Sequence, residues 1–159
     1  MTITEKNKLR LQFLARVITK EVKHLIQTDE RLFLYSFTLE QATQLEHNPQ
    51  LAEQVEAFVS RFGRLQDTLG DKLLPELLTA LGEKTSAVID NLDKAERLNF
   101  IASAEEWMTM RFLRNQMVHE YIEDPAILNS AILSAHQFVP KLISSANAMI
   151  NEIEQRGWI

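Results

Sequence analysis

Apolar residues recur every three or four positions along most of the chain, which is the spacing of one face of an α-helix. The stripes are longest over residues 51–81 and 127–149. The 159 residues include only four glycines and four prolines, too few turn-forming residues for a many-stranded sheet. The pattern therefore predicts an all-α protein.

Short capping signals indicate where the helices begin. A Ser or Thr followed three residues later by Glu or Gln is a capping box, and this spacing occurs at Thr2, Thr38 and Ser103. Asn48 and Asp124 each precede a proline, and an N-cap side chain before a first-turn proline also starts a helix. We expect helices over about residues 4–26, 38–46, 48–82, 86–98, 103–121 and 124–155.

Glycine and proline interrupt two of these expected helices. Gly70 and Pro75 predict a kink near residues 71–74, and Pro140 predicts a bend in the last helix. The connections are short enough to favour antiparallel neighbours. Since 159 residues is a usual length for one domain, we expect a single domain, residues 1–159, folded as an up-and-down antiparallel bundle of about four to five main helices.

The charge balance limits the classes of partner. The chain carries 17 Lys and Arg against 22 Asp and Glu, a net charge of −5, which argues against a broad basic surface for DNA or RNA. A local phosphate site made of a few arginines is still compatible with this charge, because charges in a cleft act over a Debye length of about 8 Å.

Several kinds of chemistry are excluded by what the chain lacks. There is no cysteine, which excludes disulfides, thiolate catalysis and Cys-ligated zinc. The four histidines have no metal-ligand spacing and no glycine-rich phosphate loop is present, so we expect neither a metal nor a cofactor. No apolar segment has the length of a signal peptide core or a membrane span, which predicts a soluble cytoplasmic protein without a membrane partner.

The densest group of chemically active side chains lies at residues 111–121. Each residue turns a helix by about 100°, so one broad face carries Arg111, Arg114, Asn115, His119 and Tyr121. The other side carries apolar residues that we expect to face the core, namely Met110, Leu113 and Met117. This segment is therefore predicted to be a helix with one buried side and one polar side.

These residue types suit phosphoryl transfer within RNA. A histidine titrates near neutral pH and can move a proton, and an arginine presents a fixed fork of donors to a phosphate that gathers negative charge. One histidine falls short of an acid-plus-base pair, but a symmetric dimer supplies a second copy. From residue types alone, a solvated helix face with local hydrogen bonds is the other interpretation.

The order of the motif residues resembles that of a known family. Arg114 and Asn115 are followed after three residues by His119, and one residue later by Tyr121. This order resembles the HEPN superfamily and, more closely, the HepT-like toxins with their Arg, four residues, His, one residue, Tyr motif. The short helix before it and the capping box at Ser103 resemble the same family's lead-in. The resemblance is specific over residues 92–121 and covers the helix order from residue 48 onward.

The resemblance implies an HEPN-like helical bundle that forms a homodimer, with paired motifs in one cleft and metal-independent endoribonuclease activity. Arg114 would stabilise the phosphate and His119 would transfer protons. Asn115 would orient these two side chains or hold the substrate. The products would be a 2′,3′-cyclic phosphate and a 5′-hydroxyl. In the HepT branch an MntA-type nucleotidyltransferase, the antitoxin, silences the toxin by attaching AMP to the motif tyrosine, which here is Tyr121.

Other interpretations remain open at the level of sequence. Arg61 and Arg64 are RNA-binding candidates together with Arg111, although a solvated face on which Arg64 pairs locally with Asp67 or with neighbours from Glu56 to Ser60 is the favoured interpretation of the first two. The same bundle also occurs in proteins described as non-catalytic substrate-binding partners of minimal nucleotidyltransferases, which is the alternative function. A purely structural helical dimer is a third interpretation.

Overall fold

The structure is a computed structural model that describes residues 3–119 and 123–159, with His119 described by its backbone alone. A short 3-10 helix, η1, and a π-helix, η2, accompany the α-helices. The described residues include no strand, which confirms the all-α prediction. In chain order the elements are α1 (Glu5–Leu32), α2 (Leu39–Thr43), η1 (Leu45–His47), α3 (Pro49–Asp67), η2 (Thr68–Leu73), α4 (Leu74–Ala80), α5 (Val88–Arg97), α6 (Ala104–His119) and α7 (Pro125–Gln155).

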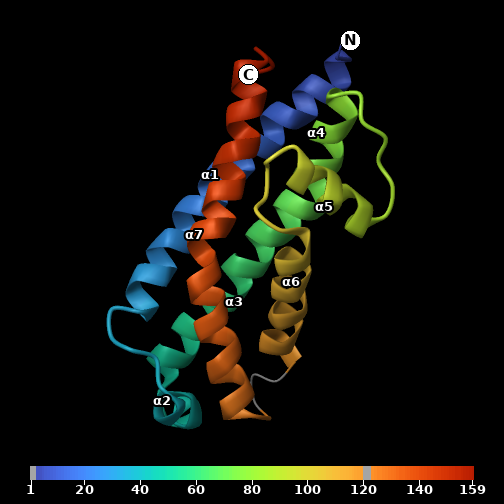
Figure 1. Ribbon diagram of the computed structural model, residues 1–159. Coiled ribbons are helices and arrows are strands. Elements are labelled where there is room, and N and C mark those ends of the chain that lie inside the picture. The colour runs from blue at the N-terminus through green and yellow to red at the C-terminus, as the bar shows by residue number, and fades with distance from the viewer. Residues whose placement is uncertain (1–2, 120–122) are drawn as a thin grey trace.

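The helices form an up-and-down bundle (Figure 1). The helix α1 runs from one end of the bundle to the other, and α3 returns through η2 and α4. The chain then descends through α5 and α6, and α7 carries it back, so that both termini lie at the same end. The packing pairs α1 with α3 and α6 with α7, and α6 also lies against α3.

Side-chain caps start the helices where the sequence signals predict them. The Thr38 hydroxyl accepts a hydrogen bond from Gln41 N, and the Gln41 side chain accepts one from Thr38 N in return. Asn48 Oδ1 accepts from Leu51 N at 3.2 Å, and Asp124 is the N-cap of α7. These starts confirm the predictions at Thr38, Asn48 and Asp124.

The first helix begins where it is expected, near residue 4, but ends later than predicted. Its N-cap is Thr4, whose hydroxyl accepts from Asn7 N at 3.1 Å, and not the Thr2 suggested by the capping-box spacing. The helix also continues six residues past the expected end at residue 26, to Leu32. Thr28 and Leu32 are buried, so the inward stripe continues through a threonine that breaks the apolar pattern in the sequence.

A widened, π-helical turn lies at the place where the kink was expected, residues 71–74. The π-helix η2 joins α3 to α4 without a break, and Leu74 N donates to Leu69 O five residues back. Pro75 then lies in the first turn of α4, where its missing N–H costs no hydrogen bond. The wider turn accommodates the proline without interrupting the helical run. Similarly, α7 continues unbroken through Pro140.

Aromatic rings connect three helices at the centre of the bundle. Phe62 on α3 is fully buried, and its ring centroid lies 5.9 Å from that of Phe58 and 6.3 Å from that of Phe138 on α7. Trp107 on α6, 2% exposed, reaches the same Phe138 at 6.1 Å. This cluster fixes α6 against α3 and α7.

A buried carboxyl group lies between α1 and η2. Glu21 is 9% exposed. The hydroxyl oxygen of Thr68 lies 2.8 Å from Glu21 Oε1 and also 2.8 Å from the backbone oxygen of Arg64. Burial raises the pKa of Glu21 above its ordinary value of 4.5, against the lowering effects of the Thr68 hydrogen bond and the Arg64 charge. Because the Thr68 hydroxyl has one proton for two acceptors, a protonated Glu21 satisfies this contact better than an ionised one.

Glu21→Gln is expected to stabilise the protein at neutral pH, because glutamine removes the buried charge and its amide can donate to Thr68. The folded wild type binds the Glu21 proton more tightly than the unfolded chain does. The cost of ionisation is therefore present above the folded-state pKa and is lost below the unfolded value near 4.5. The gain in unfolding free energy of Glu21→Gln over the wild type, measured with denaturant at several pH values between these two pKa values, should shrink as the pH falls. A gain that does not change with pH would exclude charge as its cause.

Candidate functional site

The helix α6 carries the motif and is anchored firmly at its start. Ser103 Oγ accepts from Glu106 N at 3.0 Å, and Ala104 N donates to the Glu96 side chain of α5 at 2.7 Å. The Glu106 carboxylate in turn accepts from Lys141 of α7 at 2.9 Å. These bonds fix the position and direction of the helix before its functional residues begin.

One side of α6 lies in the core, as predicted. Met117 is fully buried and Trp107 nearly so, while Met110 and Leu113 pack partly buried against the same core. The core-facing side predicted for Met110, Leu113 and Met117 is therefore confirmed, whereas the outer side also exposes the apolar side chains of Phe112 and Val118.

Arg114 reaches across to α3 and forms a two-pronged ion pair. Its Nη1 donates to Asp67 Oδ1 at 3.0 Å and its Nη2 to Asp67 Oδ2 at 2.8 Å. The arginine side chain is 26% exposed and the aspartate side chain 33%. This bidentate geometry is the strong form of a charge-assisted hydrogen bond, so Arg114 is held in a defined place.

A glycine of α3 makes room for this arginine. Gly63 lies beside the Arg114 side chain, and a Cβ added at Gly63 would come within 2.7 Å of Arg114 Nε. The close approach gives Gly63 a role in packing that goes beyond a tolerated helix glycine. The guanidinium of Arg114 is therefore positioned by the Gly63 backbone on one side and by the Asp67 carboxylate at its end.

Arg111 forms a second, looser pair one turn earlier on α6. Its Nη2 lies 3.4 Å from Asp71 Oδ2, and both side chains are about a third exposed. Two motif arginines thus meet two aspartates on the neighbouring chain segment, and the paired charges cancel locally.

Not all of the predicted motif can be placed. Asn115 is exposed, as are the large apolar side chains of Phe112 and Val118 on the same helix. His119 is the last residue of α6, and its side chain lies outside the described part of the structure. Tyr121 also lies outside the described residues.

Arg61 and Arg64 bond to groups other than the partners of the motif arginines. Arg61 donates to the backbone oxygen of His24 at 3.1 Å and to the Thr28 hydroxyl, both on α1. Arg64 donates to Ser60 Oγ at 3.2 Å, and Asp67, suggested as its partner, binds Arg114 instead. The structure therefore holds Arg61 against α1 and Arg64 beside Ser60, whereas Arg111 and Arg114 pair with Asp71 and Asp67.

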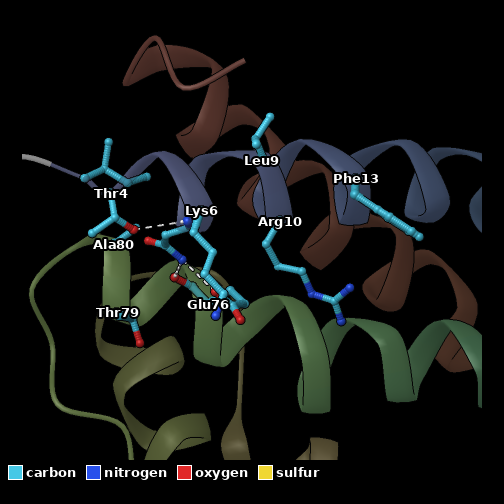
Figure 2. A pocket seen from close by; sticks show the side chains of 10 residues that line it. Thr4, Lys6, Leu9, Arg10, Phe13, Glu76, Thr79 and Ala80 are labelled. Carbon is cyan, nitrogen blue, oxygen red and sulfur yellow. Dashed lines mark hydrogen bonds between the residues drawn. The ribbon is translucent and has the colours of Figure 1, made fainter.

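A hollow elsewhere in the bundle contains none of the motif residues. It lies between the first half of α1 and α4 (Figure 2) and has a volume of about 650 Å³. Its apolar lining includes Leu9 and Phe13, and Arg10 contributes a charge. Asn7 Nδ2 donates to Glu76 Oε2 at 2.6 Å across its floor. This hollow lies near the N-terminus, whereas α6 runs toward the other end of the bundle (Figure 1).

Over residues 3–119 and 123–159, no cluster of three or more metal-binding side chains is gathered. None of the helices in this part of the chain is long and apolar enough to cross a membrane. Comparisons with protein-family models, with curated proteins and with solved structures found no match to the chain.

The partners of the motif arginines are absent from the sequence prediction. Gly63, Asp67 and Asp71 are spaced four residues apart and form a non-apolar row beside the apolar stripe of α3. Such a row could have indicated a second contact face. Its partner helix could not be identified from spacing alone, because Asp67 and Arg114 are 47 residues apart.

Proposed function

We propose that the protein is a metal-independent endoribonuclease of the HEPN type, acting in the cytoplasm as a HepT-like toxin. The observation that carries this proposal is the order Arg114, Asn115, His119, Tyr121 on a segment whose opposite side packs into the core. A core-anchored helix holds catalytic groups in a defined geometry, which is what positioning catalysis requires.

The proposed chemistry is an attack by the RNA 2′-hydroxyl on the adjacent phosphorus. His119 would accept the hydroxyl proton, the new O2′–P bond would close the 2′,3′-cyclic phosphate, and the P–O5′ bond would break as the 5′-oxygen takes a proton from the protonated motif histidine of a second copy. Arg114 would stabilise the negative charge on the phosphate oxygens, since a preformed donor fork favours that charge over neutral states. Asn115, exposed beside Arg114, would orient the substrate.

A homodimer would complete this site. One chain supplies a single motif histidine, and acid-plus-base catalysis uses two proton-transfer groups. Phe112 is 63% exposed and Val118 53% exposed on the helix that carries the motif. Burying such apolar side chains against a second copy is favourable, which supports placing the motif helices at a two-fold axis.

The cleavage proposal has a direct test. Purified protein should cut RNA in excess chelator and leave a cyclic phosphate and a 5′-hydroxyl, which mass spectrometry of the fragments identifies. If no cleavage occurs but the protein forms a stable complex with a minimal nucleotidyltransferase, the nuclease is excluded in favour of a non-catalytic substrate-binding partner.

The proposed partner is an MntA-type nucleotidyltransferase that attaches AMP to Tyr121. Co-expression of the two proteins should add whole AMP units to the intact mass, and peptide mapping should locate them on Tyr121. Tyr121→Phe is the matched control, because it removes only the acceptor hydroxyl. An unmodified chain recovered after co-expression with an active enzyme would contradict this regulation.

A further inference from the structure

The fork of donors that a phosphate would use on Arg114 is already occupied. Both terminal nitrogens of the guanidinium bind the Asp67 carboxylate, and the Nε side lies close to Gly63 of α3. A carboxylate and a phosphate are both recognised by this planar pair of donors. An RNA phosphate bound at both terminal nitrogens therefore has to replace Asp67.

The local charge also indicates that RNA has to displace the aspartates to reach these arginines. Asp67 and Asp71 neutralise Arg114 and Arg111, so the two pairs together present no net positive charge to a polyanion. Each pair is about one-quarter to one-third exposed, and an ion pair with this much solvent contact is weak enough to exchange. The pairs can therefore open without unfolding the bundle.

We propose that Asp67 is a positioning residue that holds Arg114 in an intramolecular ion pair and competes with RNA phosphate for its guanidinium. The inference rests on the proposed ribonuclease function for its substrate class. In the absence of RNA, Asp67 keeps Arg114 against α3, and RNA binding transfers the guanidinium from carboxylate to phosphate. The looser Asp71–Arg111 pair acts in the same way with a smaller effect.

Asp67→Asn tests this competition. Asparagine keeps the shape of the side chain and loses its charge, so Arg114 becomes available to phosphate. The variant should bind a 2′-O-methyl oligoribonucleotide, which cannot be cleaved by 2′-hydroxyl attack, about fivefold more tightly than the wild type, the scale of one partly exposed ion pair. The slope of its log binding constant against log salt concentration should also be more negative by about 0.7, because one more phosphate is neutralised.

Glu106→Gln is the matched control. Glu106 lies on the motif helix itself, is 35% exposed against 33% for Asp67, and is paired with Lys141 at 2.9 Å. The Glu106→Gln variant removes one negative charge, as Asp67→Asn does, but at a place distant from Arg114. It should therefore leave the slope of affinity against salt unchanged. Asp67→Glu keeps the charge and should return the affinity close to that of the wild type. Fluorescence anisotropy over a salt series measures all four proteins.

The outcomes separate this inference from the proposed function. Equal affinities and slopes for Asp67→Asn and Glu106→Gln, weaker binding by Asp67→Asn, or no binding of the probe by any of the proteins would overturn the competition. Parallel assays on natural RNA test the nuclease independently. If the variants bind the probe as expected but the protein never cleaves RNA, the inference about Asp67 stands and the proposed ribonuclease function is rejected.

Discussion

Arg114→Ala and His119→Ala are each expected to lower RNA cleavage by at least about 100-fold, the scale of losing a transition-state donor or a proton-transfer group. The Arg114→Ala variant would lose the donor fork that stabilises the phosphate. The His119→Ala variant would lose the group that moves the proton. The rate constant at saturating RNA, measured in excess chelator, is the quantity to compare. Because the two residues act on one reaction, the double variant should be little worse than either single variant.

The fold should survive both changes. Arg114→Ala leaves Asp67 without its partner, but that carboxylate is 33% exposed, so water can solvate it. Arg97→Ala is the control. Arg97 also pairs with a carboxylate, that of Glu83 at 3.5 Å, but it lies on α5 and not on the motif helix. Circular dichroism should show unchanged helix content in all variants. Cleavage that persists in both motif variants would reject the assignment of the site.

Phe62→Ala is expected to destabilise the protein by about 3–5 kcal/mol. Its ring is fully buried between Phe58 and Phe138, so truncation removes contacts between α3 and α7 and leaves a cavity at the centre of the bundle. A domain of this size is stable by about 5–15 kcal/mol in total. The loss is therefore large enough to be seen clearly in denaturant unfolding at 25 °C.

Phe112→Ala provides the comparison for the same chemical change. Phe112 is 63% exposed, so its truncation in the monomer should change the unfolding free energy by no more than about 0.5 kcal/mol. A similar loss for both variants at a concentration where the protein is monomeric would contradict the placement of these two rings. If the difference narrows as the protein concentration rises, the exposed ring is being buried by self-association.

Most of the helical architecture could be predicted because helix formation depends on local signals. The caps at Asn48 and Asp124 act within three residues, and the apolar stripes repeat with the helix itself. The errors arose where tertiary contacts override local preference. Thr28, for example, is buried within α1 although it interrupts the apolar pattern, and the helix continues to Leu32.

The candidate site was only half predictable. Spacing along one helix is sufficient to separate Arg111 and Arg114 from Met117, because side-chain direction follows from the helical turn. The same spacing contains no information about a neighbouring helix. Sequence spacing therefore does not identify Asp67 and Asp71 as partners of the motif arginines, and it favours Arg64 as the partner of Asp67 because the two are close in sequence.

The amino-acid order alone predicts an all-α chain in which one helix carries the motif residues on a single side. Periodicity and capping are short-range properties, so they need no knowledge of the fold. Packing determines which charges meet. Only when α6 lies against α3 does Gly63 admit the Arg114 side chain, and only then does Asp67 occupy its donor fork. Ion pairing depends on distance in space, and residues 47 positions apart become neighbours only in the folded bundle.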